Sequence, residues 1–186
     1  SDNTSQTPLF GDKNRLKVGY VGHLYKGRGI EVIIECAKKI KDMTFHIVGG
    51  NDKDIKYWKS YLKNLNLNNI YFYGFVSPKE TLKYRNSFDI VLAPYAKKVS
   101  VMKVRGTRQL DTSQFMSPIK IFEYMAHKKS IIASDLPVIR EVLNEKNSIL
   151  VKYDDVNLWV NAIKKFQDFK LRETISNKAF HDFKNY

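Results

Sequence analysis

The chain has 186 residues, 43% of them hydrophobic, and a formal net charge of +13. This length and apolar content predict one well-buried domain and are short for two. The sequence holds no apolar run of about 18 residues and no signal-peptide pattern, so it predicts neither a membrane-spanning helix nor an export signal. The single cysteine, Cys36, has no partner within the chain and is expected to be a buried thiol in a reducing compartment.

The first half of the chain alternates short apolar runs with helical spacings. Residues 1–15 are polar and are predicted to be a linker or a cloning remnant, whereas residues 16–186 should form the domain. In chain order the pattern predicts a strand at 16–21, a helix at 30–40, a strand at 44–48, a helix at about 53–65 and a strand at 70–73. Ser77 and Glu80 then have the spacing of a capping box, which begins a helix that runs to about residue 87, and a strand follows at 89–93.

The second half begins with some twenty residues, 96–116, that show no clear period and are expected to form a functional or mobile loop. After it the pattern predicts a helix at 117–127, a strand at 130–133, a helix at 137–143, a strand at 148–152, a helix from 154 or 155 to about 169, and a last helical segment at roughly 171–183.

Short apolar strands that alternate with helices are typical of a parallel sheet covered on both faces. We therefore predict an α/β fold with a doubly wound parallel sheet of about six strands. Ligands of such sheets bind beyond the carboxyl ends of the strands, near the point where the strand order reverses. Four segments qualify, at residues 22–29, 49–54, 73–76 and 94–119.

The charge of +13 favours an anionic partner, which could be nucleic acid, lipid or a phosphorylated ligand. The lysine pairs at 38–39, 97–98, 128–129 and 164–165 are spread out and lack the interleaved aromatic residues of a base-stacking surface. We therefore expect no nucleic-acid partner. An anionic membrane surface suits the charge better, which predicts a cytoplasmic protein placed peripherally at the inner face of the membrane.

The first strand-to-helix junction, residues 22–29, contains three glycines together with Lys26 and Arg28. It is not a G-x-G-x-x-G motif, and no acidic residue ends the second strand, so a dinucleotide dehydrogenase is poorly supported. The planar guanidinium of Arg28 is suited to holding two phosphate oxygens at any working pH.

The predicted helix at residue 117 begins in a way that favours anion binding. Ser117 is a good N-cap and Pro118 suits the first helical position, so backbone amides and the positive end of the helix dipole should point outward. Glu123 lies about 9 Å further along the axis, a suitable distance for a carboxylate to reach ribose hydroxyls. An ordinary amphipathic helix with a solvated Glu123 is the alternative, and Lys120 could either contact phosphate or be solvated.

Residues 117–143 read as this helix, a buried strand and a second helix opened by Pro137, and together they resemble the donor-binding signature of the retaining glycosyltransferases of family 4. These enzymes have the GT-B fold. The resemblance extends from about residue 16 to the C-terminus and implies a Rossmann-like domain that binds a nucleotide-sugar. The N-terminal acceptor-binding domain of such an enzyme is missing, so we expect an excised domain that is inactive alone.

The resemblance also implies roles for individual residues. Gly22, His23 and Arg28 stand in the family's diphosphate-binding junction, with His23 in place of the usual arginine, and Arg28 is the first choice for the group that stabilises the departing diphosphate. The segment 71–78 matches the one that borders the nucleotide base, which assigns a base contact to Val76. Further donor contacts are implied at Met116, Ser117, Pro118, Ile119 and Lys120.

The family signature has two glutamates separated by seven residues, of which the second contacts ribose and the first contacts the transferred sugar. Glu123 stands at the second position, but Phe115 occupies the first and cannot accept a sugar hydroxyl. Nearby candidates for this contact are Asp111, Ser113, Gln114 and the backbone amides around Met116.

We expect no metal and no cofactor, with the nucleoside-diphosphate sugar as substrate. Asp52 and Asp54 form a D-x-D, which holds a divalent cation in a different glycosyltransferase fold. They follow a Gly-Gly turn, where Asn51 or Asp52 can instead cap the next helix. The four histidines have no zinc-ligand spacing with the lone cysteine.

The predicted function is therefore donor binding in a retaining glycosyltransferase of polysaccharide biosynthesis, which transfers a sugar to a glycan or lipid-linked acceptor. One alternative is a stand-alone nucleotide-binding or interaction module whose basic face meets a membrane or an acidic partner. Another is a nucleotide-sugar epimerase of related fold, which the segment around Ser117 resembles less. The sequence identifies neither the base, the sugar nor the acceptor.

Overall fold

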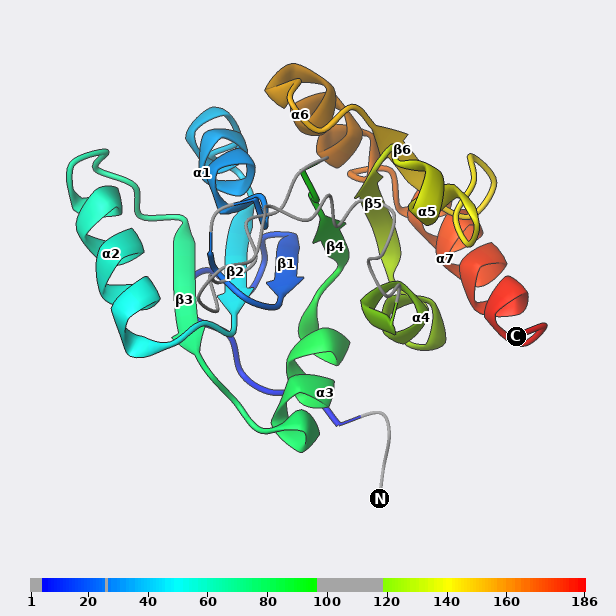
Figure 1. Cartoon of the computed structure of the whole chain (residues 1–186), viewed down its shortest axis with the longest axis horizontal. Helices are drawn as coiled ribbons and strands as arrows, with labels where there is room; N and C mark the ends of the chain where they lie inside the picture. Colours follow the sequence, from blue (N-terminus) through cyan, green and yellow to red (C-terminus); the bar gives the residue numbers. More distant parts are fainter. Residues whose placement is uncertain (1–4, 26, 97–118) are drawn as a thin grey trace, which may run out of the picture.

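The computed structural model describes residues 5–25, 27–96 and 119–186. Six strands of these residues form one sheet in which all neighbours are parallel, in the order β3-β2-β1-β4-β5-β6 (Figure 1). The strands are β1 (Lys17–Val21), β2 (Thr44–Val48), β3 (Ile70–Gly74), β4 (Ile90–Ala93), β5 (Ser130–Ser134) and β6 (Ile149–Val151). This arrangement confirms the predicted α/β, doubly wound, Rossmann-like fold.

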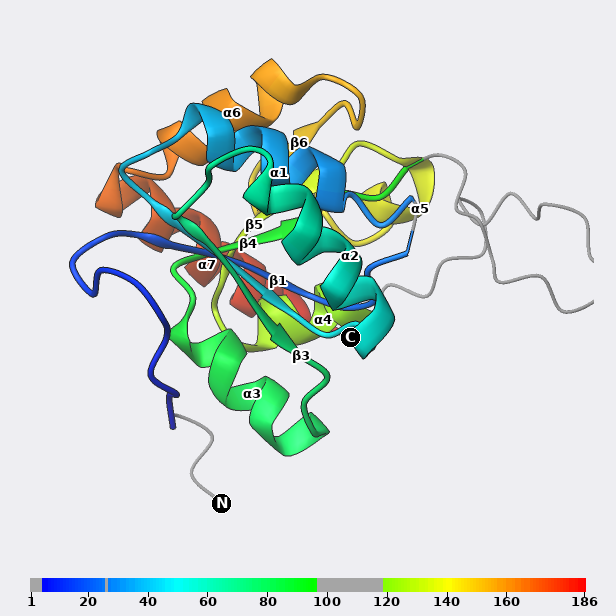
Figure 2. The same cartoon turned by 90° about the vertical axis from the view of Figure 1, so that its left-hand side faces the viewer.

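Helices cover both faces of the sheet (Figure 2). They are α1 (Ile30–Lys39), α2 (Asp52–Lys63), α3 (Pro78–Ser87), α4 (Ile119–Ala126), α5 (Pro137–Arg140), α6 (Val156–Lys165) and α7 (Phe169–Phe183). Residues of α1, α2 and α6 share one apolar cluster, which includes Phe45 and Trp159. A second cluster lies on the other face, where Tyr124 of α4 and Ala179 of α7 pack with Ile131. The continuous apolar strands are therefore buried on both sides, as the sequence predicted.

The strand order reverses between β1 and β4. β1 pairs with β2 over five residues, but its register with β4 has only two pairs, Val18 with Ile90 and Gly19 with Val91. The ring of Phe88 comes so close here that a Cβ on Gly19 would lie 2.0 Å from it. A crevice forms at such a reversal, beyond the carboxyl ends of the two strands.

Local signals fixed several helix ends. The capping box is confirmed, because the Ser77 amide donates to the Glu80 carboxylate and the Glu80 amide donates to the Ser77 hydroxyl. The helix predicted to run to about residue 169 ends earlier, at Lys165, since the Asp168 carboxylate accepts the amides of residues 170 and 171 and begins α7. The helix predicted at 137–143 is shorter and ends at Arg140.

The segment before β1 packs on the domain. The Phe10 ring stacks on Tyr73 at 5.2 Å between centroids, and its amide donates to the Tyr73 hydroxyl. That hydroxyl also bonds Nδ1 of buried His46, whose Nε2 bonds the Thr44 hydroxyl. Burial lowers the pKa of His46 to about 4. Residues of this segment thus contact the domain, and the assignment of residues 1–15 as a linker or cloning remnant stays a prediction.

Two further expectations concern membrane spans and Cys36. No helix in the described part of the chain is long and apolar enough to cross a bilayer. Cys36 is fully buried, and burial raises the pKa of its thiol to about 12, as expected for a structural thiol.

Candidate functional site

An open pocket of about 550 Å³ lies beside the carboxyl ends of β1 and β4. It takes residues from three of the four segments expected from the sequence, namely 22–29, 73–76 and 94–119. The predicted site residues that line it are Gly22, His23, Arg28, Val76, Ile119, Lys120 and Glu123. Met116, Ser117 and Pro118, with Phe115 and the predicted helix start, lie outside the described residues.

The fourth segment, residues 49–54, does not line this pocket. The side chain of Asn51 accepts the Asp54 amide at 2.9 Å and caps α2, so these residues follow the capping alternative. Among the residues that the structure describes, no group of three His, Cys, Asp or Glu side chains could hold a metal ion.

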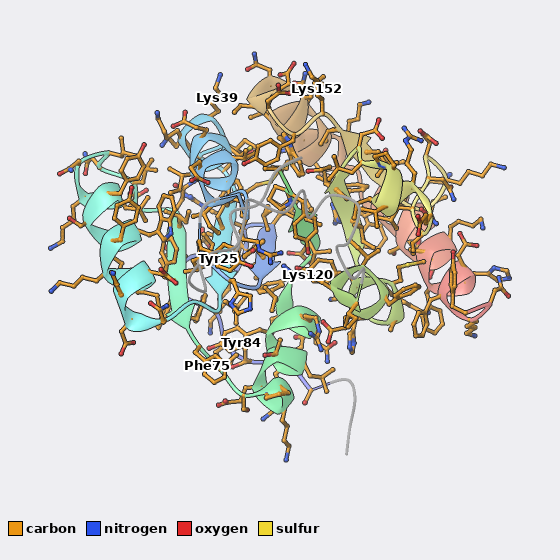
Figure 3. The ribbon with its side chains drawn as sticks, viewed as in Figure 1. Tyr25, Lys39, Phe75, Tyr84, Lys120 and Lys152 are labelled. Carbon is orange, nitrogen blue, oxygen red and sulfur yellow. The ribbon has the colours of Figure 1, made fainter. Side chains whose placement is uncertain are left out.

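Lys120 points into the pocket from the first turn of α4. Its Nζ lies 4.3 Å from the ring centroid of Tyr20 and 5.2 Å from that of Tyr95. A Cβ on Gly22 would come within 2.5 Å of this Nζ, so glycine leaves room for the ammonium group. Figure 3 shows Lys120 and Tyr25 near the middle of the molecule, over the central strands. Lys120 is therefore half-buried in the site, and its phosphate contact stays a prediction.

Arg28 supplies a second cation to the same pocket. Its guanidinium lies 4.7 Å from the ring centroid of Tyr25, donates to the Tyr25 hydroxyl and lies 5.8 Å from the ring centroid of Tyr95. Burial, followed by the positive charge of Arg28, lowers the pKa of Lys120 to about 7, and Glu123 opposes this effect. Two like charges held together in a sheltered site favour a bound anion, which would relieve their repulsion.

Glu123 is fixed beside the pocket from two directions. Its Oε2 accepts a hydrogen bond of 2.8 Å from Nη1 of Arg85 on α3. The next residue, Tyr124, accepts the Val21 amide on its hydroxyl at 3.2 Å and thereby ties α4 to the end of β1. The Glu123 side chain remains 41% exposed, so its carboxylate can still meet a ligand.

The remaining lining residues give the pocket an apolar rim. Phe75 is 83% exposed and Ile119 is 64% exposed, and Val76 lies beside Phe75. His23 is exposed and its ring stacks on Tyr25 at 5.5 Å between centroids. Apolar side chains at a mouth with two cations and one carboxylate suit a ligand that has a flat or sugar-like part and a phosphate part.

Sequence reasoning missed Arg85 and Tyr95. An arginine in a polar helix gave no sign that it faces the site. For Tyr95 the available signal was its place in the predicted ligand-binding segment 94–119, although the residue itself was not singled out.

The chain matches the family model of the group 1 glycosyl transferases over residues 15–168. It belongs to this family. Curated relatives agree with the assignment of this glycosyl transferase chain. TuaH of Bacillus subtilis strain 168, named for a glycosyltransferase role in teichuronic acid biosynthesis, is 28% identical over 122 residues, which are 64% of this chain and 27% of that protein. An uncharacterized glycosyltransferase of Methanocaldococcus jannaschii is 33% identical over 84 residues, 43% of this chain and 21% of that protein.

Solved glycosyltransferase structures share the fold. HepE of Anabaena, in complex with UDP and glucose, has a TM-score of 0.74 at 18% identity over 92% of this chain and 44% of that one. The C-terminal domain of LpcC, a group 1 family protein of Francisella tularensis, has a TM-score of 0.70 at 22% identity over 91% and 85%. The chain spans about a quarter of the curated relatives and less than half of HepE.

Proposed function

We propose that this glycosyl transferase chain binds the donor, a nucleoside-diphosphate sugar, in a retaining enzyme of family 4 that glycosylates a glycan or lipid-linked acceptor. The observation that carries the proposal is the meeting of Arg28, Lys120 and Glu123 in one pocket at the β1–β4 crevice. The complexes of HepE with UDP and UDP-glucose support it, since that protein has the same fold.

The two cations suit the chemistry of the departing group. When the bond between the anomeric carbon and the β-phosphate oxygen breaks, its electron pair stays with the diphosphate. The acceptor oxygen bonds to the same carbon and gives its proton to the diphosphate. Arg28 and Lys120 would stabilise the transition state, in which negative charge grows on the diphosphate, more than the ground state. They would take the role that a divalent cation has in glycosyltransferases of the D-x-D type. We therefore propose a reaction that needs no bound metal.

Glu123 would accept hydrogen bonds from the ribose, while Val76 and Phe75 border the base. In the whole enzyme the acceptor would be held by another domain, so we expect these 186 residues to bind nucleotide without turnover. Retention of anomeric configuration rests on the resemblance of residues 117–143 to family 4.

Calorimetric titration with UDP, GDP and ADP tests donor binding. We expect at least one of them to bind, and Glu123→Ala to weaken that binding by about 10-fold, because a hydrogen bond to a charged group is lost. Glu173→Ala, an exposed glutamate of α7, is the matched control and should bind as the unmodified chain does. Failure of all three nucleotides at millimolar concentration would overturn the proposal.

We further propose a peripheral site of action at the cytoplasmic face of the membrane. Helix α2 exposes Lys53, Lys56 and Lys63 together with Tyr57, which is 62% exposed. Lysines near an anionic surface contribute about 1 kcal/mol each, and tyrosine favours the membrane interface. Cosedimentation with phosphatidylserine vesicles should fall when the three lysines become glutamine. Glu123→Ala should leave it unchanged, which separates this property from donor binding and tests the alternative of a stand-alone basic module.

A further inference from the structure

Arg85 is the only buried residue of α3 and is 7% exposed. The aromatic side chain of α3 that packs against the apolar core, Tyr84, is only partly buried, so the side chain that this helix buries most fully is a charged one. Burying a guanidinium is costly unless it is paired, so its partner should explain its position. In the described part of the chain that partner is Glu123 on α4, at 2.8 Å.

The contact uses only part of each group. Nη1 of Arg85 bonds Oε2 of Glu123, while Nε of Arg85 is buried without a hydrogen-bond partner among the described residues. Within that same part of the chain, no donor is recorded on the other carboxylate oxygen, Oε1. Since Glu123 lines the pocket and is 41% exposed, Oε1 is the oxygen available to a ligand.

The cations of the pocket also attract the carboxylate of Glu123. Lys120 lies three residues away on the same helix, and the charge of Glu123 acts on it and on the nearby Tyr95. Without Arg85, the carboxylate would be drawn toward the cations Lys120 and Arg28. It would then compete with a diphosphate for them and leave the ribose position.

We propose that Arg85 is a positioning residue that holds Glu123 by Oε2, so that Oε1 faces a ribose and the two pocket cations stay available to the diphosphate. This inference rests on the proposed donor binding. It also links the two sides of the pocket, because α3 follows the base-bordering residues Phe75 and Val76 and α4 carries Glu123. The site therefore discriminates ribonucleotides from deoxyribonucleotides through Arg85.

The test compares the Kd of UDP with the Kd of 2′-deoxy-UDP. The unmodified chain should bind UDP about 10-fold more tightly than 2′-deoxy-UDP. Arg85→Met should weaken the binding of UDP and reduce the ratio of the two Kd values to below about 2-fold. Glu123→Gln should reduce the ratio in the same way, and the double variant should lose nothing more, because both residues act through one contact. Arg140→Met, which removes an exposed arginine of α5 with acidic partners, should keep the ratio.

If Arg85 had only a structural role, its loss would weaken the binding of UDP and of 2′-deoxy-UDP equally, and the ratio of the two Kd values would not change. That outcome overturns the inference and leaves donor binding standing, as does an unmodified chain that binds UDP and 2′-deoxy-UDP alike. If no nucleotide binds the unmodified chain, the proposed function itself fails. Should Arg85→Met not fold, as judged by circular dichroism, Arg85→Lys replaces it, because the shorter reach of lysine should still lower the ratio.

Discussion

Replacing Lys120 by arginine should remove most of the pH dependence of diphosphate binding. The pKa of Lys120 is lowered to about 7, first by burial and then by Arg28, so its amine loses its proton near neutral pH. Arginine stays charged throughout this range. The other groups that face Lys120 are Glu123 and the phenols of Tyr20 and Tyr95, and both phenols have raised pKa values, about 12 for Tyr95.

The size of the effect follows from the fraction of Lys120 that is protonated. With a pKa of about 7, this fraction is about three-quarters at pH 6.5 and about 3% at pH 8.5. If only the ammonium form binds a diphosphate, the Kd rises by up to about 25-fold across this interval. The sign is tighter binding at lower pH, because a bound anion raises the pKa of the amine again. The phosphate itself titrates near pH 6, but equally for every variant, so it cancels in the comparison.

Calorimetry with UDP at pH 6.5, 7.5 and 8.5 measures the effect in the unmodified chain, Lys120→Arg and Lys120→Met. The unmodified chain should approach Lys120→Arg at the lowest pH and Lys120→Met at the highest. Lys164→Arg, an exposed position of α6, serves as the control and should follow the unmodified chain. Equal pH slopes for the unmodified chain and Lys120→Arg would refute the reasoning.

Three predictions concern stability, measured as the free energy of unfolding in urea. Burial lowers the folded-state pKa of His46 to about 4, so its contribution to the free energy of unfolding should be fully present above about pH 6.5. The free energy of unfolding should fall by up to about 3 kcal/mol as the pH drops toward 4, and an equal fall in His46→Gln would contradict this. Gly19→Ala should cost about 1–3 kcal/mol, since its Cβ would lie 2.0 Å from the Phe88 ring, and adding Phe88→Leu should recover part; no loss in Gly19→Ala would refute the close contact. Asn69→Ala should cost about 1–3 kcal/mol, because Nδ2 donates to the carbonyls of Ala37, Ile40 and Met43 at 3.1, 2.8 and 3.3 Å, in the stretch from the end of α1 to the start of β2. Exposed Asn68→Ala should cost little, and a similar loss there would count against this role.

The strands and most helices could be predicted because their signals are local. A parallel strand buried on both faces must be a short apolar run, and the runs at 44–48 and 70–73 agree with β2 and β3 to within a residue. A cap is equally local, as the confirmed pair of Ser77 and Glu80 illustrates. The end of α6 was missed because the apolar pattern continues through Phe166, and Asp168 was not read as a new cap.

Site residues with local sequence signals could likewise be predicted, whereas those that depend on helix packing could not. Gly22, Arg28 and Glu123 lie in segments that follow strands or begin helices, so the doubly wound topology alone brings them to one edge. The pairing of Arg85 with Glu123 depends on how α3 and α4 lie beside each other, and no local pattern records this. In a helix as polar as α3, an inward arginine looks like any solvated one.

Because β1 and β4 share a short register, a ligand bound in the pocket beside them affects the stability of the fold. One wall comes from the chain before β4 and the other from Tyr95 and α4, while the two halves of the sheet share only two register pairs there. A molecule bound across this junction joins the halves, and its binding energy adds to their cohesion by mass action. The concentration of the ligand would then set the fraction of the chain that stays folded as well as the fraction that is occupied.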